Sequence, residues 1–240
     1  MIRSAPGLVD ACASGTPFGI VTVVTFSIIA RDPERGLFGV AVSTAVPCVG
    51  AMVPHVKPGV GAIATQSYTN VRLGIDGLRL LELGLSPEAA LTALLREDAE
   101  AAQRQVAGID NQGRIYAYSG DECVDWYGAR SGEAYSVQGN MLVGKETIDA
   151  MADAFEQAKG HLSARLLEAL EAGQAAGGDK RGRESAALLV APFGDEQWSK
   201  IDIRVDQHPD PVAELRRIGN VLTEHYREQI EAAEQEQNEE

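Results

Sequence analysis

Two apolar runs near the start of the chain decide the fold: Val-Thr-Val-Val-Thr-Phe-Ser-Ile-Ile-Ala (21–30) and Leu-Phe-Gly-Val-Ala-Val-Ser-Thr (37–44). Their length and their β-branched and apolar content are typical of buried strands. The residues between them, Arg-Asp-Pro-Glu-Arg-Gly (31–36), have proline and glycine where a tight turn needs them. Because this connection is short, we expect the two strands to pair antiparallel.

Strands and pairs of helices follow one another along the rest of the chain. The small and apolar residues 59–66 predict a buried strand, and Ser-Pro-Glu (86–88) provides an N-cap and a proline in the first turn of a helix. Similar patterns predict strands within 105–118 and over 135–143, 185–191 and 200–205, and helices over 72–83, 146–158, 161–172 and from about 211 onward. Helices that arrive in pairs after antiparallel hairpins favour two stacked sheets covered by helix pairs.

The composition excludes several classes of function. The 240 residues include 35 Asp and Glu against 21 Lys and Arg, for a net charge of −14. This balance argues against non-specific binding to nucleic acid and against docking on anionic membranes. Three cysteines without a CxxC pair and four dispersed histidines predict neither a metal site nor a disulfide framework, and no cofactor motif is present. We expect a cytoplasmic protein without metal or cofactor.

Thr25 is a polar residue within the first apolar run, and it has two interpretations. A threonine simply suits a pleated strand. Alternatively, its hydroxyl is a nucleophile, which requires a base beside it. The pattern of histidines suggests no partner, so the simplest base is the α-amino group of Thr25 itself, with a pKa near 8. That interpretation requires Thr25 to be the first residue of the mature chain.

Side-chain amides interrupt two other apolar segments. Gln66 ends a predicted strand and is followed by Tyr68 and Asn70 before a helix begins, where backbone N–H groups favour negative charge. Gln138 and Asn140 flank a glycine in a similar setting. These amides either bind a peptide-like substrate or an oxyanion, or they satisfy buried backbone groups.

The polar loop 177–185 leads directly into a predicted strand. It contains Asp179, Arg181, Arg183 and Ser185. Such a loop is either a flexible surface turn or the site where an arginine holds a substrate carboxylate.

Six blocks of sequence, in this order, resemble the bacterial family known as domain of unknown function 1028. They are Thr-Phe-Ser-Ile-Ile-Ala-Arg-Asp-Pro (25–33), Gly-Val-Ala-Val-Ser (39–43), Gly-Val-Gly-Ala-Ile-Ala-Thr-Gln (59–66), Tyr-Ser-Val-Gln-Gly-Asn-Met-Leu (135–142), Gly-Gly-Asp-Lys-Arg-Gly-Arg-Glu-Ser-Ala-Ala-Leu-Leu-Val (177–190) and Asp-Gln-His-Pro-Asp-Pro (206–211). The resemblance covers about residues 25–218. It implies an α+β fold of the N-terminal-nucleophile (Ntn) hydrolase type, a four-layer αββα sandwich.

The resemblance also implies roles for particular residues. Family members begin Met-Thr-Phe-Ser, which makes Thr25 the nucleophile, with Gln138, Asn140 and Asp179 in segments that support it. Ser43 stands where proteasome-like relatives have an acid, and their supporting lysine has no clear match, although Lys57 is nearby. Ser43, Gln66, Tyr68, Asn70, Arg181, Arg183 and Ser185 are the expected substrate-binding residues.

The 24 residues before Thr25 depart from the family pattern. Three explanations are open. The start codon was assigned too early, with Val24 in the place of the initiator Met; or these residues form a propeptide that is removed; or they remain attached to the mature chain. We favour the first explanation. The predicted division is a leader at 1–24, a domain at 25–218 and a C-terminal helix with an acidic tail at 219–240.

The resulting hypothesis is an Ntn hydrolase that cleaves a small amide or peptide bond and forms a homodimer or higher homo-oligomer. The alternatives are a non-catalytic binding protein and an assembly subunit with the same fold.

Overall fold

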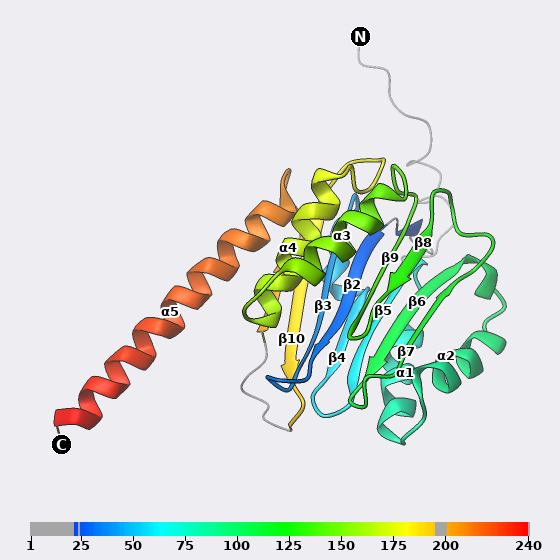
Figure 1. Cartoon of the computed structure of the whole chain (residues 1–240). Coiled ribbons are helices and arrows are strands. Elements are labelled where there is room, and N and C mark those ends of the chain that lie inside the picture. The colour runs from blue at the N-terminus through cyan, green and yellow to red at the C-terminus, as the bar shows by residue number, and fades with distance from the viewer. Residues whose placement is uncertain (1–21, 24, 195–200, 240) are drawn as a thin grey trace, which may run out of the picture.

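The protein is a sandwich of two antiparallel sheets covered by helices on both outer faces (Figure 1). The computed structural model describes residues 22–23, 25–194 and 201–239. Helices α1 (Val71–Glu82) and α2 (Pro87–Arg96) cover the first sheet. Helices α3 (Glu146–Gln157) and α4 (Leu162–Ala175) cover the second, beside the first part of α5 (Pro211–Glu239). The predicted four-layer αββα fold is confirmed.

The first sheet, sheet A, is built around β5. Its strands are β1 (Thr22–Val23), β4 (Pro54–Lys57), β5 (Gly61–Tyr68), β6 (Arg104–Asp110) and β7 (Ile115–Ser119). Strands β1 and β4 pair with the two ends of β5, and β6 pairs with β5 and β7. The short 3-10 helices η1 (Val49–Ala51) and η2 (Ala101–Gln103) precede β4 and β6.

The second sheet, sheet B, has the strand order β11-β10-β3-β2-β9-β8. The bounds are β2 (Thr25–Asp32), β3 (Leu37–Thr44), β8 (Gly128–Ser131), β9 (Tyr135–Asn140), β10 (Ser185–Pro192) and β11 (Ile201–Val205). The predicted hairpin of the two opening runs is β2 and β3, which pair antiparallel over eight residues.

Alternation along β2 assigns each side chain to one of two cores. Phe26 and Ile28 pack against the α3–α4 layer, whereas Ile29 packs between the two sheets. A third core joins sheet A to α1 and α2. Thr25 and Ser27 share the face of Ile29, because side chains two residues apart lie on the same side of a strand. At its N-terminal end, β2 therefore carries polar side chains on the face between the two sheets, although these side chains are fully buried.

Regular structure lies on both sides of each predicted domain boundary. Helix α5 continues without a break across the predicted boundary at 218/219 and runs away from the body of the molecule (Figure 1). Of the predicted leader, residues 22–23 form β1 and pair with Tyr68 and Ser67. The rest of the leader, including Val24, lies outside the described residues. No helix in the described ranges is long and apolar enough to cross a membrane.

Candidate functional site

Four polar residues form a row across sheet B, at the end of β2 where Thr25 lies. The register places Asn140 of β9 beside Thr25, Thr25 beside Thr44 of β3, and Thr44 beside Ser185 of β10. All four are buried, and Thr25 has no solvent-exposed surface. The Thr25 hydroxyl donates to Oγ1 of Thr44 at 3.4 Å. The row brings three of the predicted site residues together and adds Thr44.

The structure places Thr44, rather than Ser43, on the face of Thr25. Ser43 pairs with Phe26 and Ala186, and both of these residues belong to the core beneath α3 and α4. Its buried hydroxyl has no hydrogen-bond partner in the described structure. Sequence reasoning missed Thr44 because the two hydroxyl residues are adjacent, and only the register of the strand separates their faces.

Gln66 crosses from sheet A to hold the start of β2. Its Oε1 accepts a hydrogen bond from the Ser27 hydroxyl at 2.7 Å, and its Nε2 donates to the backbone carbonyl of Thr25 at 3.3 Å. The same Nε2 donates to Oε1 of Gln105 at 2.8 Å. Gln66 thus fixes the backbone of Thr25 from the opposite sheet.

Gln105 of β6 is a buried hub that the sequence analysis missed. Its Oε1 accepts from Gln66 and from Nδ2 of Asn140, and its Nε2 donates to the carbonyl of Gly139 at 2.9 Å and to Oγ of Ser119 at 2.9 Å. The available signal was alternation: Gln105 precedes Ala107 and Ile109 on the face of β6 that packs between the sheets.

Gln138 lies on the same face of β9 as Asn140, two residues before it, and its side chain also forms a hydrogen bond between the sheets. Its Nε2 donates to the carbonyl of Ala64 in sheet A at 3.1 Å and approaches the Ser27 hydroxyl at 3.5 Å. Its buried Oε1 has no partner among the described atoms. This oxygen is an unused acceptor within the polar end of the sandwich.

Asp179 fastens the polar loop to the end of β3. Its Oδ2 accepts from the backbone N–H of Ala45 at 3.0 Å, directly after Thr44, and its Oδ1 accepts from the N–H of Arg181 at 2.8 Å. The Arg181 guanidinium forms an ion pair with the same carboxylate at 3.2 Å. Arg183 instead pairs with Asp210 at 3.3 Å. Both predicted carboxylate clamps therefore have carboxylate partners within the chain.

The side chains of Ser185 and Lys57 both have hydrogen-bond or ion-pair partners within the protein. The Ser185 hydroxyl donates to the carbonyl of Val46 at 2.6 Å and accepts from the N–H of Val49 at 3.1 Å. Lys57 pairs with Glu82 at 2.5 Å and lies opposite Gly61, at the end of β5 remote from Gln66. The register therefore does not place Lys57 beside Thr25.

An ion-pair cluster holds the junction between β5 and α1. Arg104 donates to the carbonyl of Tyr68 at 2.6 Å and to the Asp98 carboxylate at 2.9 Å, and Asn70 donates to Asp98 at 2.8 Å. Asn70 also caps α1 by accepting from the N–H of Arg72. Burial alone raises the pKa of Asp98, but the hydrogen bonds from Arg104, Asn70 and the Glu100 N–H outweigh it and hold this pKa below its ordinary value.

The lowered pKa of Asp98 predicts a pH-dependent contribution to stability. A carboxyl whose pKa is lower in the folded state stabilises the fold above its unfolded pKa, about 3.9, and loses that contribution as the pH falls through the folded value. We expect Asp98→Asn to lower the free energy of unfolding by about 3 kcal/mol at pH 7. The difference from wild type should shrink below about pH 4.

Urea unfolding at pH 7, 5 and 3.5 measures this difference. Asp76→Asn is the matched control, because Asp76 pairs with Arg72 and Arg79 on an exposed face of α1 and should contribute less than about 1 kcal/mol. Equal losses for the two variants at pH 7 would contradict the assignment of the buried cluster.

The base available to Thr25 is limited by its surroundings. In the described part of the chain, no His, Lys or carboxylate group forms a hydrogen bond with its side chain. Nor do the described residues contain a group of three His, Cys, Asp or Glu that could hold a metal ion. The hydrogen bonds of the described residues therefore identify no basic side chain for Thr25.

Fold and site together define an αββα sandwich protein with a buried row of hydroxyl and amide groups between its sheets. Residues 25–215 match a family of unknown function, DUF1028, and the chain belongs to this family. The crystal structure of SPO2555 from Silicibacter pomeroyi, described under the same family, is 33% identical, with a TM-score of 0.77 over 83% of this chain and 89% of that one. Anbu, the ancestral β-subunit from Yersinia bercovieri, is 13% identical, with a TM-score of 0.38 over 84% of this chain and 96% of that one. No functionally curated protein matches.

Proposed function

We propose that the protein is an N-terminal-nucleophile hydrolase that cleaves a small amide or peptide bond, with Thr25 as nucleophile. The observation that carries this proposal is the position of Thr25. It is the first residue of a central strand, its hydroxyl lies in a buried row of polar groups, and its backbone is held from the opposite sheet by Gln66. The match to the family also begins at Thr25.

The proposed reaction proceeds through an ester on Thr25. The α-amino group takes the hydroxyl proton while Oγ1 attacks the carbonyl carbon of the amide, and the leaving amine receives that proton as the C–N bond breaks. Water then attacks the ester, which releases the acid and restores the hydroxyl. This chemistry requires a free α-amino group, so the chain must begin at Thr25.

The neighbouring residues act mainly by positioning Thr25 in this proposal. Gln66 binds the Thr25 carbonyl, and Asn140 lies beside Thr25 while its amide is held by Gln105. Asp179 fixes the chain directly after Thr44. Such a preorganised arrangement is what a nucleophile needs, because reorganisation during the reaction raises the barrier.

A non-catalytic binding protein is the second candidate, and a specific observation favours it. The amide nitrogens of Gln66, Gln138 and Asn140, which were expected to serve an oxyanion, all donate within the protein. Arg181 likewise has an internal carboxylate partner. If Thr25 remains an internal residue, the polar row is a structural device for joining the sheets.

The N-terminus of the mature protein separates the two candidates. We expect the protein expressed from its native gene, upstream region included, to begin at Thr25 by intact mass and N-terminal sequencing. A β-lactone should then add one acyl group, on Thr25. A stable, folded chain that still begins at Met1 and resists the β-lactone would support the binding protein. Gel filtration of the same sample tests the expected homo-oligomer.

A further inference from the structure

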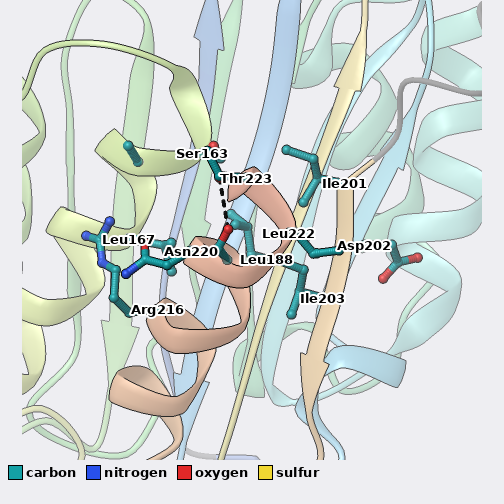
Figure 2. A pocket seen from close by; sticks show the side chains of 12 residues that line it. Ser163, Leu167, Leu188, Ile201, Asp202, Ile203, Arg216, Asn220, Leu222 and Thr223 are labelled. Atoms are coloured by element: carbon teal, nitrogen blue, oxygen red, sulfur yellow. Dashed lines mark hydrogen bonds between the residues drawn. The ribbon is translucent and has the colours of Figure 1, made fainter. Parts of the chain in front are cut away.

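A cavity of about 280 Å³ lies between α4, α5 and the strands β10 and β11 (Figure 2). One wall consists of aliphatic side chains: Leu167, Leu188, Ile201, Ile203 and Leu222. Leu188 pairs with Ala41 and shares its helix-facing core, whereas Ser185 of the same strand belongs to the polar row. The cavity is therefore on the opposite face of sheet B from Thr25.

Gly219 keeps this cavity open. It lies within α5 and lines the cavity, and a Cβ atom added there would first meet Cδ1 of Leu167 at 3.4 Å, an ordinary van der Waals contact. Neither close packing nor a left-handed backbone requires a glycine at this position. Glycine inside a helix costs about 1 kcal/mol relative to alanine. The missing side chain leaves space that a larger residue would fill.

The charges around the cavity favour a neutral occupant. The Arg216 guanidinium makes two hydrogen bonds of 2.8 Å to Glu171, which neutralises its charge. Asp202 alternates with Ile201 and Ile203 along β11, so its side chain points away from α5 and from the cavity (Figure 2). The net charge of −14 disfavours a negatively charged ligand.

One polar group at the cavity remains available. The Thr223 hydroxyl donates to the carbonyl of Gly219 at 2.9 Å and is satisfied within the helix. Asn220 is exposed, and its side chain makes no hydrogen bond to the described part of the protein. An amide offers both a donor and an acceptor to a ligand.

We propose that this cavity binds a small neutral molecule with an apolar body and one hydrogen-bonding group that reaches Asn220. A cavity of about 150 Å³ holds one benzene ring. The volume of this one therefore suits a fused pair of rings or a short acyl chain, about ten to fifteen heavy atoms. The site is independent of Thr25 and of the proposed hydrolysis.

Calorimetric titration of the full chain with 2-naphthol tests the proposal. 2-Naphthol is neutral at pH 7, has two fused rings and carries one hydroxyl. We expect saturable 1:1 binding with a dissociation constant on the order of 100 µM. Binding of 2-naphthoate, which adds a negative charge to the same ring system, should be at least about ten-fold weaker.

Two variants on α5 locate the site. Gly219→Leu fills the cavity and replaces a poor helix former with a good one, so it should retain the wild-type melting temperature or exceed it, and weaken 2-naphthol binding at least about ten-fold. Val221→Leu is the matched control, since Val221 is 56% exposed and does not line the cavity, and its affinity should be unchanged. Asn220→Ala should weaken binding about five-fold.

Absence of saturable binding to the wild-type chain would overturn the proposal. So would equal affinity of wild type and a folded Gly219→Leu variant. A third outcome would be that 2-naphthol does not bind and that Gly219→Leu converts a dimer into a monomer on gel filtration. A second copy of the chain would then cover the cavity, and the small-molecule proposal would again be overturned. Should Gly219→Leu fail to fold, equal affinity of Asn220→Ala and wild type would overturn the proposal in its place. None of these readouts depends on Thr25.

Discussion

Thr25→Ala is expected to abolish modification by a β-lactone, lowering the rate by at least about 1,000-fold, while the protein stays folded. The rate falls because the substitution removes the only oxygen that attacks in the proposed reaction. Stability should change by less than about 1 kcal/mol, since the side chain makes a single long hydrogen bond, 3.4 Å to Thr44. Time-resolved mass spectrometry measures the rate, and thermal unfolding reports the stability.

Two further variants separate chemistry from packing. Thr25→Ser retains the hydroxyl and should keep measurable modification. Thr65→Ala removes another fully buried threonine, whose hydroxyl donates to the carbonyl of Asn70 at 3.2 Å. We expect Thr65→Ala to lose stability but to react with the β-lactone at the wild-type rate. Undiminished modification of Thr25→Ala would show that another residue reacts and would remove the basis of the hydrolase proposal.

Phe26→Ala is expected to lower the free energy of unfolding by about 4 kcal/mol. Phe26 is fully buried beneath α3 and α4, and its ring lies against Gly173 and Gly178, which leave room for it. Truncation removes apolar burial and leaves a cavity that the surrounding helices fill only in part. In a domain of this size the melting temperature should fall by roughly 10 °C.

The control for Phe26 is Leu83→Ala, because Leu83 is 76% exposed at the end of α1 and should change stability by less than about 0.5 kcal/mol. Urea unfolding gives both values. A loss below about 1 kcal/mol for Phe26→Ala would mean that α3 and α4 close over the vacated space. The packing of α4 against β2 would then be more adaptable than the structure indicates.

Much of the fold followed from the sequence because its signals were local. The two apolar runs predicted the β2–β3 hairpin, and the cap at Ser86 with Pro87 predicted the start of α2, which begins at Pro87. The prolines at 47, 54 and 58 predicted a loop with short extended pieces, and one of these pieces is β4. Proline is tolerated in β4 because the strand begins with Pro54 and β5 is its only partner in the described sheet.

The candidate site was harder to predict because it depends on register between distant strands. Thr25, Gln66, Gln138 and Asn140 stood out as polar residues in apolar runs, and the structure brings them together. Gln105 alternates with Ala107 and Ile109, but its role depends on contacts with Gly139 and Asn140, more than thirty residues away, which the sequence of β6 alone does not predict. The pairing of Arg181 with Asp179 is likewise set by the folded shape of its loop.

The hydrogen bonds between the sheets have a consequence for how the two halves align. Aliphatic contacts, such as those of Ile29 and Val40 with Ala107 and Ile109, tolerate small sliding or rotation because dispersion is not directional. The bonds of Gln66 and Gln105 to sheet B are directional and short, so a shift of even about 1 Å would leave buried amides unpaired. These two glutamines therefore fix the position of one sheet relative to the other. They select one stacking of the sheets from the many that burial of apolar surface alone would allow.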